Sequence, residues 1–419
     1  MGDASSERGG RLTRSWGDQL FTRERLTVYP LMILVLSALL WAADILLGDP
    51  PLTASGSAVL PDFLAYWTGG NLVADGHAAV LYDAVAQAEL QRETVPGLRD
   101  GLSWFVAPPF VAVLYAPLGA LPFAFAACAF TVLSLAALCL VGRMLGPTVR
   151  RDRNLPVGLF VLVVAASPAV FEAIGSGQNS PFLLLLWVVA LRQVRIGADA
   201  TAGVLFALTA FKPHLVLLIP VWLVVRRKWR ALAAFGVGGA ALFAIPLVFL
   251  PSHALDAWRT ALTSATFGQH VQVGQTWKME SVSALLTDVT GWSRIDVVVL
   301  AAGVAGLALW LAKLRPDPLR DLAVVATVTV CCAPHVMLYD AVLLIIPVVW
   351  LASERRLRDF RWHLLALFLI QFTTAIRHLL AETTFLLGWL DWAWAAVPAV
   401  AIALAMYRLT TRPSPELPA

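Results

Sequence analysis

The sequence predicts an all-α polytopic membrane protein, and three observations lead to this fold class. Of the 419 residues, 59% are hydrophobic and only 14% are charged, whereas soluble domains are about a quarter charged. Apolar runs suited to bilayer-spanning helices follow one another along most of the chain. Lysine and arginine gather in short clusters between these runs, as is typical of cytoplasmic loops. The net charge of +4 therefore indicates membrane topology, not nucleic-acid binding.

The N-terminal region combines a polar segment with a long apolar run. Residues 1–25 are arginine-rich, and we expect them to be disordered and cytoplasmic. The following run, 26–47, is longer than the roughly 7–15 residues of a signal-peptide core. This run is therefore predicted to be an uncleaved signal anchor and the first span.

The basic clusters predict the topology of residues 26–410, which we treat as a single transmembrane domain. If every cluster is cytoplasmic, the chain crosses the membrane an even number of times between consecutive clusters. About twelve crossings then place both termini inside, with 411–419 as a cytoplasmic tail. The predicted spans are 26–47, 109–142, 156–174, 181–195, 201–211, 213–225, 231–250, 295–314, 321–333, 338–352, 363–380 and 393–409.

Several of these spans are shorter than the ~20 residues that a bilayer requires. We expect them to form broken or paired helices whose polar tips lie below the outer surface, because irregular backbone is tolerated there only where it lines a cavity. The stretch 109–142 has two interpretations. It is either one long tilted helix or a re-entrant turn at Pro117–Pro122 followed by a span.

This topology sends two large loops and several hairpin tips to the outer face. The loops are 48–104, the first periplasmic loop, and 251–294, the second. Apolar residues at helical spacing over 83–94 predict a short helix lying on the membrane. Nearly all of the non-basic polar side chains fall in these outer segments, which indicates a functional site on that face.

Asp62 follows the first span and is surrounded by apolar and aromatic residues, among them Tyr66. Partial desolvation raises the pKa of a carboxylate toward the range of a general base. The alternative is that Asp62 is a helix N-cap or a solvated loop acid.

Two hairpin tips carry further candidates. Gln178 and Asn179 are either part of a tight turn or a set of amides facing a polar ligand. Lys212 lies within an apolar run, where a lysine is costly unless it snorkels or pairs. A phosphate group is the anionic partner that we favour for it.

The remaining candidates are residues that orient or contact the substrates. His335, with Tyr339 and Asp340, forms another polar tip, where histidine and carboxylate either orient each other or contact a phosphate. Asp83 and His270 are candidates for acceptor binding or support, as are Tyr339 and Asp340. No cluster of carboxylates or histidines in the sequence predicts a metal ion or cofactor, and no nucleotide-binding motif is visible.

A series of short motifs in fixed order resembles glycosyltransferase family 87 of the GT-C superfamily. The resemblance covers residues 26 to 350, and the order and spacing of its motifs together are specific. The motifs are Asp62-Phe63-x-x-Tyr66-Trp67-x-x-Gly70, Leu81-Tyr82-Asp83, Ala107-Pro108-Pro109-Phe110, Ala116-Pro117-Leu118, Gly177-Gln178-Asn179, Ala202-Gly203, Lys212-Pro213 and Arg226-Arg227-Lys228-Trp229-Arg230. One departure is Ala107, where relatives often carry tyrosine before the two prolines.

The resemblance implies a GT-C fold in a bacterial inner membrane, with its active site on the periplasmic face. It implies a polyprenyl-phosphate-linked sugar, mannose in this family, as donor and a glycolipid or glycan as acceptor. It also implies metal-independent, inverting transfer with Asp62 as the base. A transporter or flippase of a lipid-linked saccharide is the main alternative, although the outward concentration of polar tips and the lack of an inverted repeat disfavour it. A non-catalytic scaffold would not need Asp62 and Lys212 where they stand.

Overall fold

The computed structural model describes residues 23–99, 101–153, 157–264, 279, 281–292 and 294–353. Every regular element in these ranges is a helix, which confirms the all-α prediction. The predicted spans 363–380 and 393–409, the C-terminal tail and the candidate His270 lie outside the described residues.

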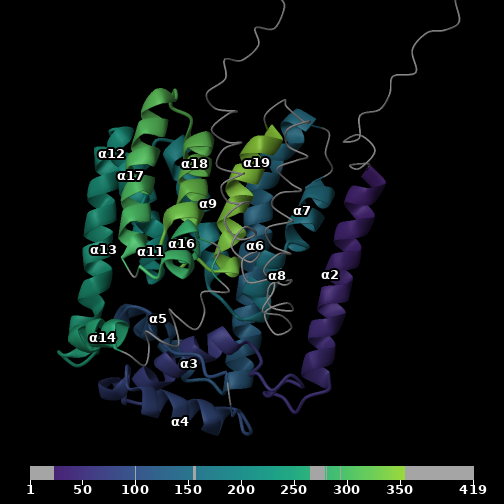
Figure 1. The fold of residues 1–419 in the computed structure, drawn as a ribbon, viewed down its shortest axis with the longest axis vertical. Coiled ribbons are helices and arrows are strands. Elements are labelled where there is room, and N and C mark those ends of the chain that lie inside the picture. Colours follow the sequence, from purple (N-terminus) through teal and green to yellow (C-terminus); the bar gives the residue numbers. More distant parts are fainter. Residues whose placement is uncertain are drawn as a thin grey trace, which may run out of the picture.

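Four helices of the described ranges are long and apolar enough to cross a membrane. They are α2 (Arg23–Leu46), α6 (Phe123–Arg153), α13 (Trp229–Phe249) and α17 (Ile295–Lys313). These helices run roughly parallel, with α13 and α2 at opposite edges of the bundle in this view (Figure 1). Large apolar side chains such as Leu40 and Val237, 64% and 71% exposed, stand on the outside of the bundle. Such surfaces are stable in lipid and costly in water, so the protein is a membrane protein. The total of about twelve crossings stays a prediction.

Shorter helices pack between and against the long ones. Their bounds are α7 Val157–Ala165, α8 Pro168–Gly175, α9 Ser180–Arg195, α10 Asp199–Leu208, α11 Pro213–Val216, α12 Ile219–Val225, α16 Val282–Thr290, α18 Pro318–Cys332 and α19 Ile345–Ser353. Prolines occupy the first turn of α8, α9, α11, α12 and α18, where a missing N–H costs no helical hydrogen bond. The predicted broken helices are therefore real segments with defined starts.

The stretch 109–142 is not a single helix. Helix α5 (Pro109–Gly119) ends in a turn, and α6 begins at Phe123, so the single-helix interpretation is wrong and the chain breaks near the predicted turn at Pro117–Pro122. That this turn is re-entrant in the membrane stays a prediction. The turn lies where α5 crosses α3 (Pro61–Ala74). A Cβ at Gly119 would lie 2.2 Å from the backbone nitrogen of Asn71, and one at Gly70 would lie 2.5 Å from the Tyr115 carbonyl oxygen. These two glycines allow the close helix crossing.

A layer of helices covers one end of the bundle (Figure 1). It consists of α3, α4 (Ala84–Thr94), α5 and α14 (Ala254–Thr263). The predicted surface helix over 83–94 corresponds to α4. The basic α12–α13 and α17–α18 connections lie at the opposite end of the bundle. At that end Arg226 forms a buried, two-point ion pair with Asp321, with distances of 2.6 and 2.8 Å, which joins α12 to α18.

Candidate active site

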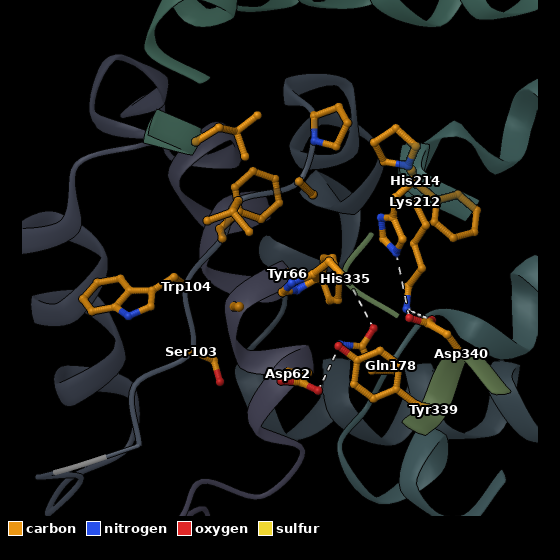
Figure 2. A pocket seen from close by; sticks show the side chains of 18 of the residues that line it. Asp62, Tyr66, Ser103, Trp104, Gln178, Lys212, His214, His335, Tyr339 and Asp340 are labelled. Atoms are coloured by element: carbon orange, nitrogen blue, oxygen red, sulfur yellow. Dashed lines mark hydrogen bonds and ion pairs between the residues drawn. The ribbon is translucent and has the colours of Figure 1, made fainter. Parts of the chain in front are cut away.

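The hairpin tips meet the helical layer around a cavity of about 280 Å³ (Figure 2). Six parts of the chain form its walls: the start of α3, the segment 103–108, the α8–α9 tip, the α10–α11 tip, α14 and residues 335–340. The lining residues are Asp62, Ala65, Tyr66, Ser103, Trp104, Phe105, Val106, Ala107, Pro108, Gln178, Phe211, Lys212, Pro213, His214, Trp258, Leu262, His335, Tyr339 and Asp340. The cavity thus unites most of the sequence-predicted candidates.

Asp62 lies in the first turn of α3 and is half-buried. It is not the N-cap, because Leu60 holds that position and no side chain caps the helix. The Asp62 backbone N–H donates to the Ser176 carbonyl at 2.9 Å, which ties α3 to the α8–α9 tip. The preceding Leu60 has φ +52°, a left-handed conformation that costs about 1–2 kcal/mol for a residue with a Cβ. Strain of this kind is typical of functional sites.

Gln178 connects Asp62 to the aromatic part of the cavity. Its Nε2 donates to Asp62 Oδ2 at 2.9 Å, and its Oε1 accepts a weak 3.4 Å hydrogen bond from the Tyr66 hydroxyl. Figure 2 shows the Gln178 amide between the two side chains. Because both ends of the amide are engaged, Gln178 fixes the direction of the Asp62 carboxylate.

Lys212 is buried, 5% exposed, and paired, so it does not snorkel to a surface. Its Nζ lies 2.6 Å from Asp340 Oδ1 and 2.8 Å from Ser180 Oγ, and 4.3 Å above the centre of the Tyr339 ring. The Ser180 hydroxyl donates to the same Asp340 oxygen at 2.9 Å. Asp340 is 1% exposed and also accepts from the Met337 backbone N–H at 3.2 Å. Lys212 thus lines the cavity as a buried ammonium held in place by Asp340 and Ser180.

Two histidines lie beside this ion pair. The His214 and His335 rings meet edge to face with centroids 6.1 Å apart, and His214 Nε2 lies 3.9 Å from Asp340 Oδ2. Burial lowers the pKa of His335 to about 4, and the neighbouring His214 acts in the same direction. His335 is therefore a neutral hydrogen-bonding group at neutral pH, not a cation. Its φ of +57° is a second strained backbone position at the cavity.

Asn179 and Asp83 lie outside the cavity lining. Asn179 is 2% exposed beside the Tyr66 and Tyr115 phenols, yet neither atom of its amide reaches a hydrogen-bonding geometry with the described residues. Asp83 is exposed and caps α4, accepting from the backbone N–H groups of Val85 and Ala86 at 2.8 and 3.0 Å. The structure therefore gives Asp83 a helix-capping role and does not bring it to the cavity.

Comparison with models of protein families shows which family the chain belongs to. The model of glycosyltransferase family 87 matches residues 105–339. The chain belongs to glycosyltransferase family 87. Neither the curated proteins nor the solved structures contain a match to it. The matched range includes Gln178, Lys212 and His335, whereas Asp62 precedes it and Asp340 follows it directly.

The family assignment makes the protein a membrane glycosyltransferase. Among the cavity residues of this family 87 glycosyltransferase, sequence reasoning missed Ser103, Trp104 and Trp258. It also missed Ser180, which is buried outside the lining and bonded to Lys212 and Asp340. Ser180 precedes Pro181 at the start of an apolar helix, where a serine is expected simply to begin the helix. The available signal was its place directly after Gln178 and Asn179.

Gly177 is expected to be intolerant of substitution. Its φ is +75°, and an added Cβ would lie 2.5 Å from Phe63 Cβ and 2.9 Å from Leu60 Cβ. Gly177→Ala should therefore push the start of α3 away from Gln178 and lower both stability and transfer, the strain alone costing about 1–2 kcal/mol. Melting temperature in detergent and sugar transfer measure the two effects. Gly197→Ala is the control, because its φ is +78° but no atom lies within 4 Å of the added Cβ. Equal effects of the two variants would contradict the packing argument.

Proposed function

We propose that this family 87 glycosyltransferase moves a sugar from a polyprenyl-phosphate donor to a glycolipid or glycan acceptor, with Asp62 as general base. The observation that carries the proposal is that a half-buried carboxylate and a buried lysine line the same cavity. Base and anion site are the two groups that displacement of a phosphate from a sugar requires.

The reaction is a single displacement at the anomeric carbon of the sugar. The acceptor oxygen attacks that carbon, Asp62 takes the proton of the acceptor hydroxyl, and the bond from the carbon to the phosphate oxygen breaks. The electron pair of this bond leaves with the polyprenyl phosphate. Attack opposite the leaving group inverts the configuration at the anomeric carbon.

The leaving phosphate gains negative charge as the bond breaks. Lys212 supplies the positive charge that stabilises it, and neutral His335 supplies a hydrogen bond. Gln178 orients the base, and Tyr66 is the candidate in this cavity for contacts to the sugar hydroxyls or phosphate oxygens. Asn179 lines a neighbouring apolar groove and is the candidate for such contacts from that side. Tyr339 lies under the Lys212 ammonium, and Asp340 holds that ammonium in place.

A second, apolar cavity supports a lipid-linked donor. It measures about 690 Å³ and lies between α5, α6, α9 and α13. Phe211, directly before Lys212, lines both this groove and the polar cavity. At its rim Leu114 and Phe249 are 63% and 65% exposed. A polyprenyl chain in this groove would have its phosphate beside Lys212 and its far end in the bilayer.

The charge distribution supports a periplasmic active site in a bacterial inner membrane. The α12–α13 and α17–α18 connections are basic and lie opposite the helical layer, and the positive-inside bias favours a cytoplasmic position for such connections. Mannose is the sugar proposed, from the family resemblance alone.

The test is sugar transfer by the purified protein in detergent. Radiolabelled polyprenyl-phosphate mannose and radiolabelled GDP-mannose are supplied separately, each with a membrane lipid extract as acceptor source. We expect a labelled glycolipid only from the polyprenyl-linked donor, because the cavity has an anion site beside an apolar groove. Transfer from GDP-mannose alone would overturn the proposed donor class. Donor movement across proteoliposomes without transfer would support the transporter instead.

A further inference from the structure

The wall of the cavity formed by residues 103–108 has an unusual support. These residues belong to no helix, and α5 begins directly after them at Pro109. Two glutamines one turn apart on α4, Gln87 and Gln91, are fully buried behind the wall. A buried amide is costly unless all of its hydrogen-bonding groups are satisfied.

Each glutamine pairs with one backbone residue of the wall through both ends of its amide. Gln91 accepts from the Ser103 N–H at 3.2 Å and donates to the Ser103 carbonyl at 2.5 Å. Gln87 accepts from the Phe105 N–H at 2.8 Å and donates to the Phe105 carbonyl at 3.3 Å, and also to the Leu81 carbonyl at 2.9 Å. The glutamines thus bind alternate residues as a neighbouring strand would.

Two aromatic side chains hold the remainder of the wall. The Tyr82 hydroxyl donates to the Ala107 carbonyl at 2.7 Å, and Trp258 Nε1 donates to the Val106 carbonyl at 3.0 Å. The wall is therefore fixed before any ligand arrives. Such preorganisation improves binding because little conformational entropy remains to be lost.

The two sides of the cavity differ in chemistry. Figure 2 shows Trp104 and Ser103 on one side of Asp62, and Lys212, His214 and Asp340 on the other. None of the lining residues from 103–108 or from α14 is charged. Their faces are aromatic and aliphatic, with the Ser103 hydroxyl at the edge, which suits the C–H face and hydroxyl rim of a sugar ring and not a phosphate.

We infer that residues 103–108 and Trp258 form the acceptor subsite and bind a saccharide ring against Trp104, with one hydroxyl directed at Asp62. The inference rests on the proposed function and moves acceptor binding from Asp83 to this wall. The donor phosphate occupies the opposite, Lys212 side. Asp62 then stands between the two substrates, as in-line displacement requires.

The test separates acceptor binding from donor binding. Initial rates of Trp104→Ala are measured while the lipid extract is varied at fixed polyprenyl-phosphate mannose, and then while the donor is varied at fixed extract. We expect the half-saturating amount of extract to rise about tenfold and that of donor to change less than about twofold. Trp104→Phe should recover part of the loss, because it keeps an aromatic face.

Two further variants distinguish loss of acceptor binding from misfolding. Ala107→Leu adds bulk to the wall and so narrows the cavity without removing a side chain, and it should also raise the half-saturating amount of extract. Trp229→Ala, 57% exposed at the opposite end of the bundle, is the control for loss of a tryptophan and should change neither value. The acceptor assignment would be overturned if only the half-saturating amount of donor rose. It would also be overturned if neither Trp104→Ala nor Ala107→Leu changed the half-saturating amount of extract. Absence of transfer by the wild type would instead overturn the proposed function, and this inference with it.

Discussion

Asp62→Asn is expected to reduce sugar transfer by a factor of about 10²–10⁴, the usual contribution of a general base. The asparagine oxygen still accepts the Gln178 amide hydrogen bond, so the start of α3 keeps its position. The substitution changes charge and basicity with almost no change of shape. Its effect on the free energy of unfolding should stay within about 1 kcal/mol.

Radiolabelled transfer at equal protein levels measures this effect. Asp83→Asn is the matched control, because Asp83 caps α4 at an exposed position and asparagine caps as well as aspartate. We expect the control to keep full activity. Equal activity of Asp62→Asn and the wild type would remove Asp62 from the role of base.

Lys212→Met is expected to abolish transfer and to destabilise the protein. Asp340 would remain as a carboxylate that is 1% exposed and has lost the ammonium paired with it. Removing one partner of a buried ion pair typically costs about 3–5 kcal/mol. Activity alone therefore cannot separate phosphate binding from folding, and melting temperature in detergent must be measured beside transfer.

The double variant Lys212→Met, Asp340→Asn makes the separation. The asparagine that replaces Asp340 is neutral, and its Oδ1 can accept from the Met337 N–H while its Nδ2 donates to the Ser180 hydroxyl oxygen, so most of the lost stability should return while transfer does not. The control is Arg226→Met, which breaks the other buried pair, with Asp321. It should lose stability but keep transfer per folded protein. Wild-type donor dependence in the double variant would remove Lys212 from phosphate binding.

Residues that stand out chemically against an apolar background could be predicted from the sequence. Asp62, Gln178, Lys212 and His335 are polar side chains beside apolar runs, and the structure brings all four to one cavity. Polar groups in such surroundings are costly, so their presence is a strong signal. The broken helices could also be predicted from the sequence, because proline and glycine interrupt the apolar runs where the helices break.

Residues whose role depends on a distant partner could not be predicted. Gln87 and Gln91 look like ordinary polar positions of a surface helix. Only the fold brings the backbones of Ser103 and Phe105 within hydrogen-bonding distance of them. Asp83 shows the opposite case. An acidic residue in the outer loop was predicted to support acceptor binding, but the structure makes it a helix cap. Trp104 could not be told from any other tryptophan near a membrane interface.

The stereochemistry of transfer tests the central claim most directly. The proposed transfer uses one base, Asp62, and one displacement at the anomeric carbon, so product and donor must have opposite anomeric configurations. The measurement is the anomeric configuration of the newly formed linkage, determined by NMR on product made by the purified wild type from a donor of known configuration. Inversion is the predicted result. Retention would require a covalent intermediate or a second displacement and would contradict the proposed role of Asp62.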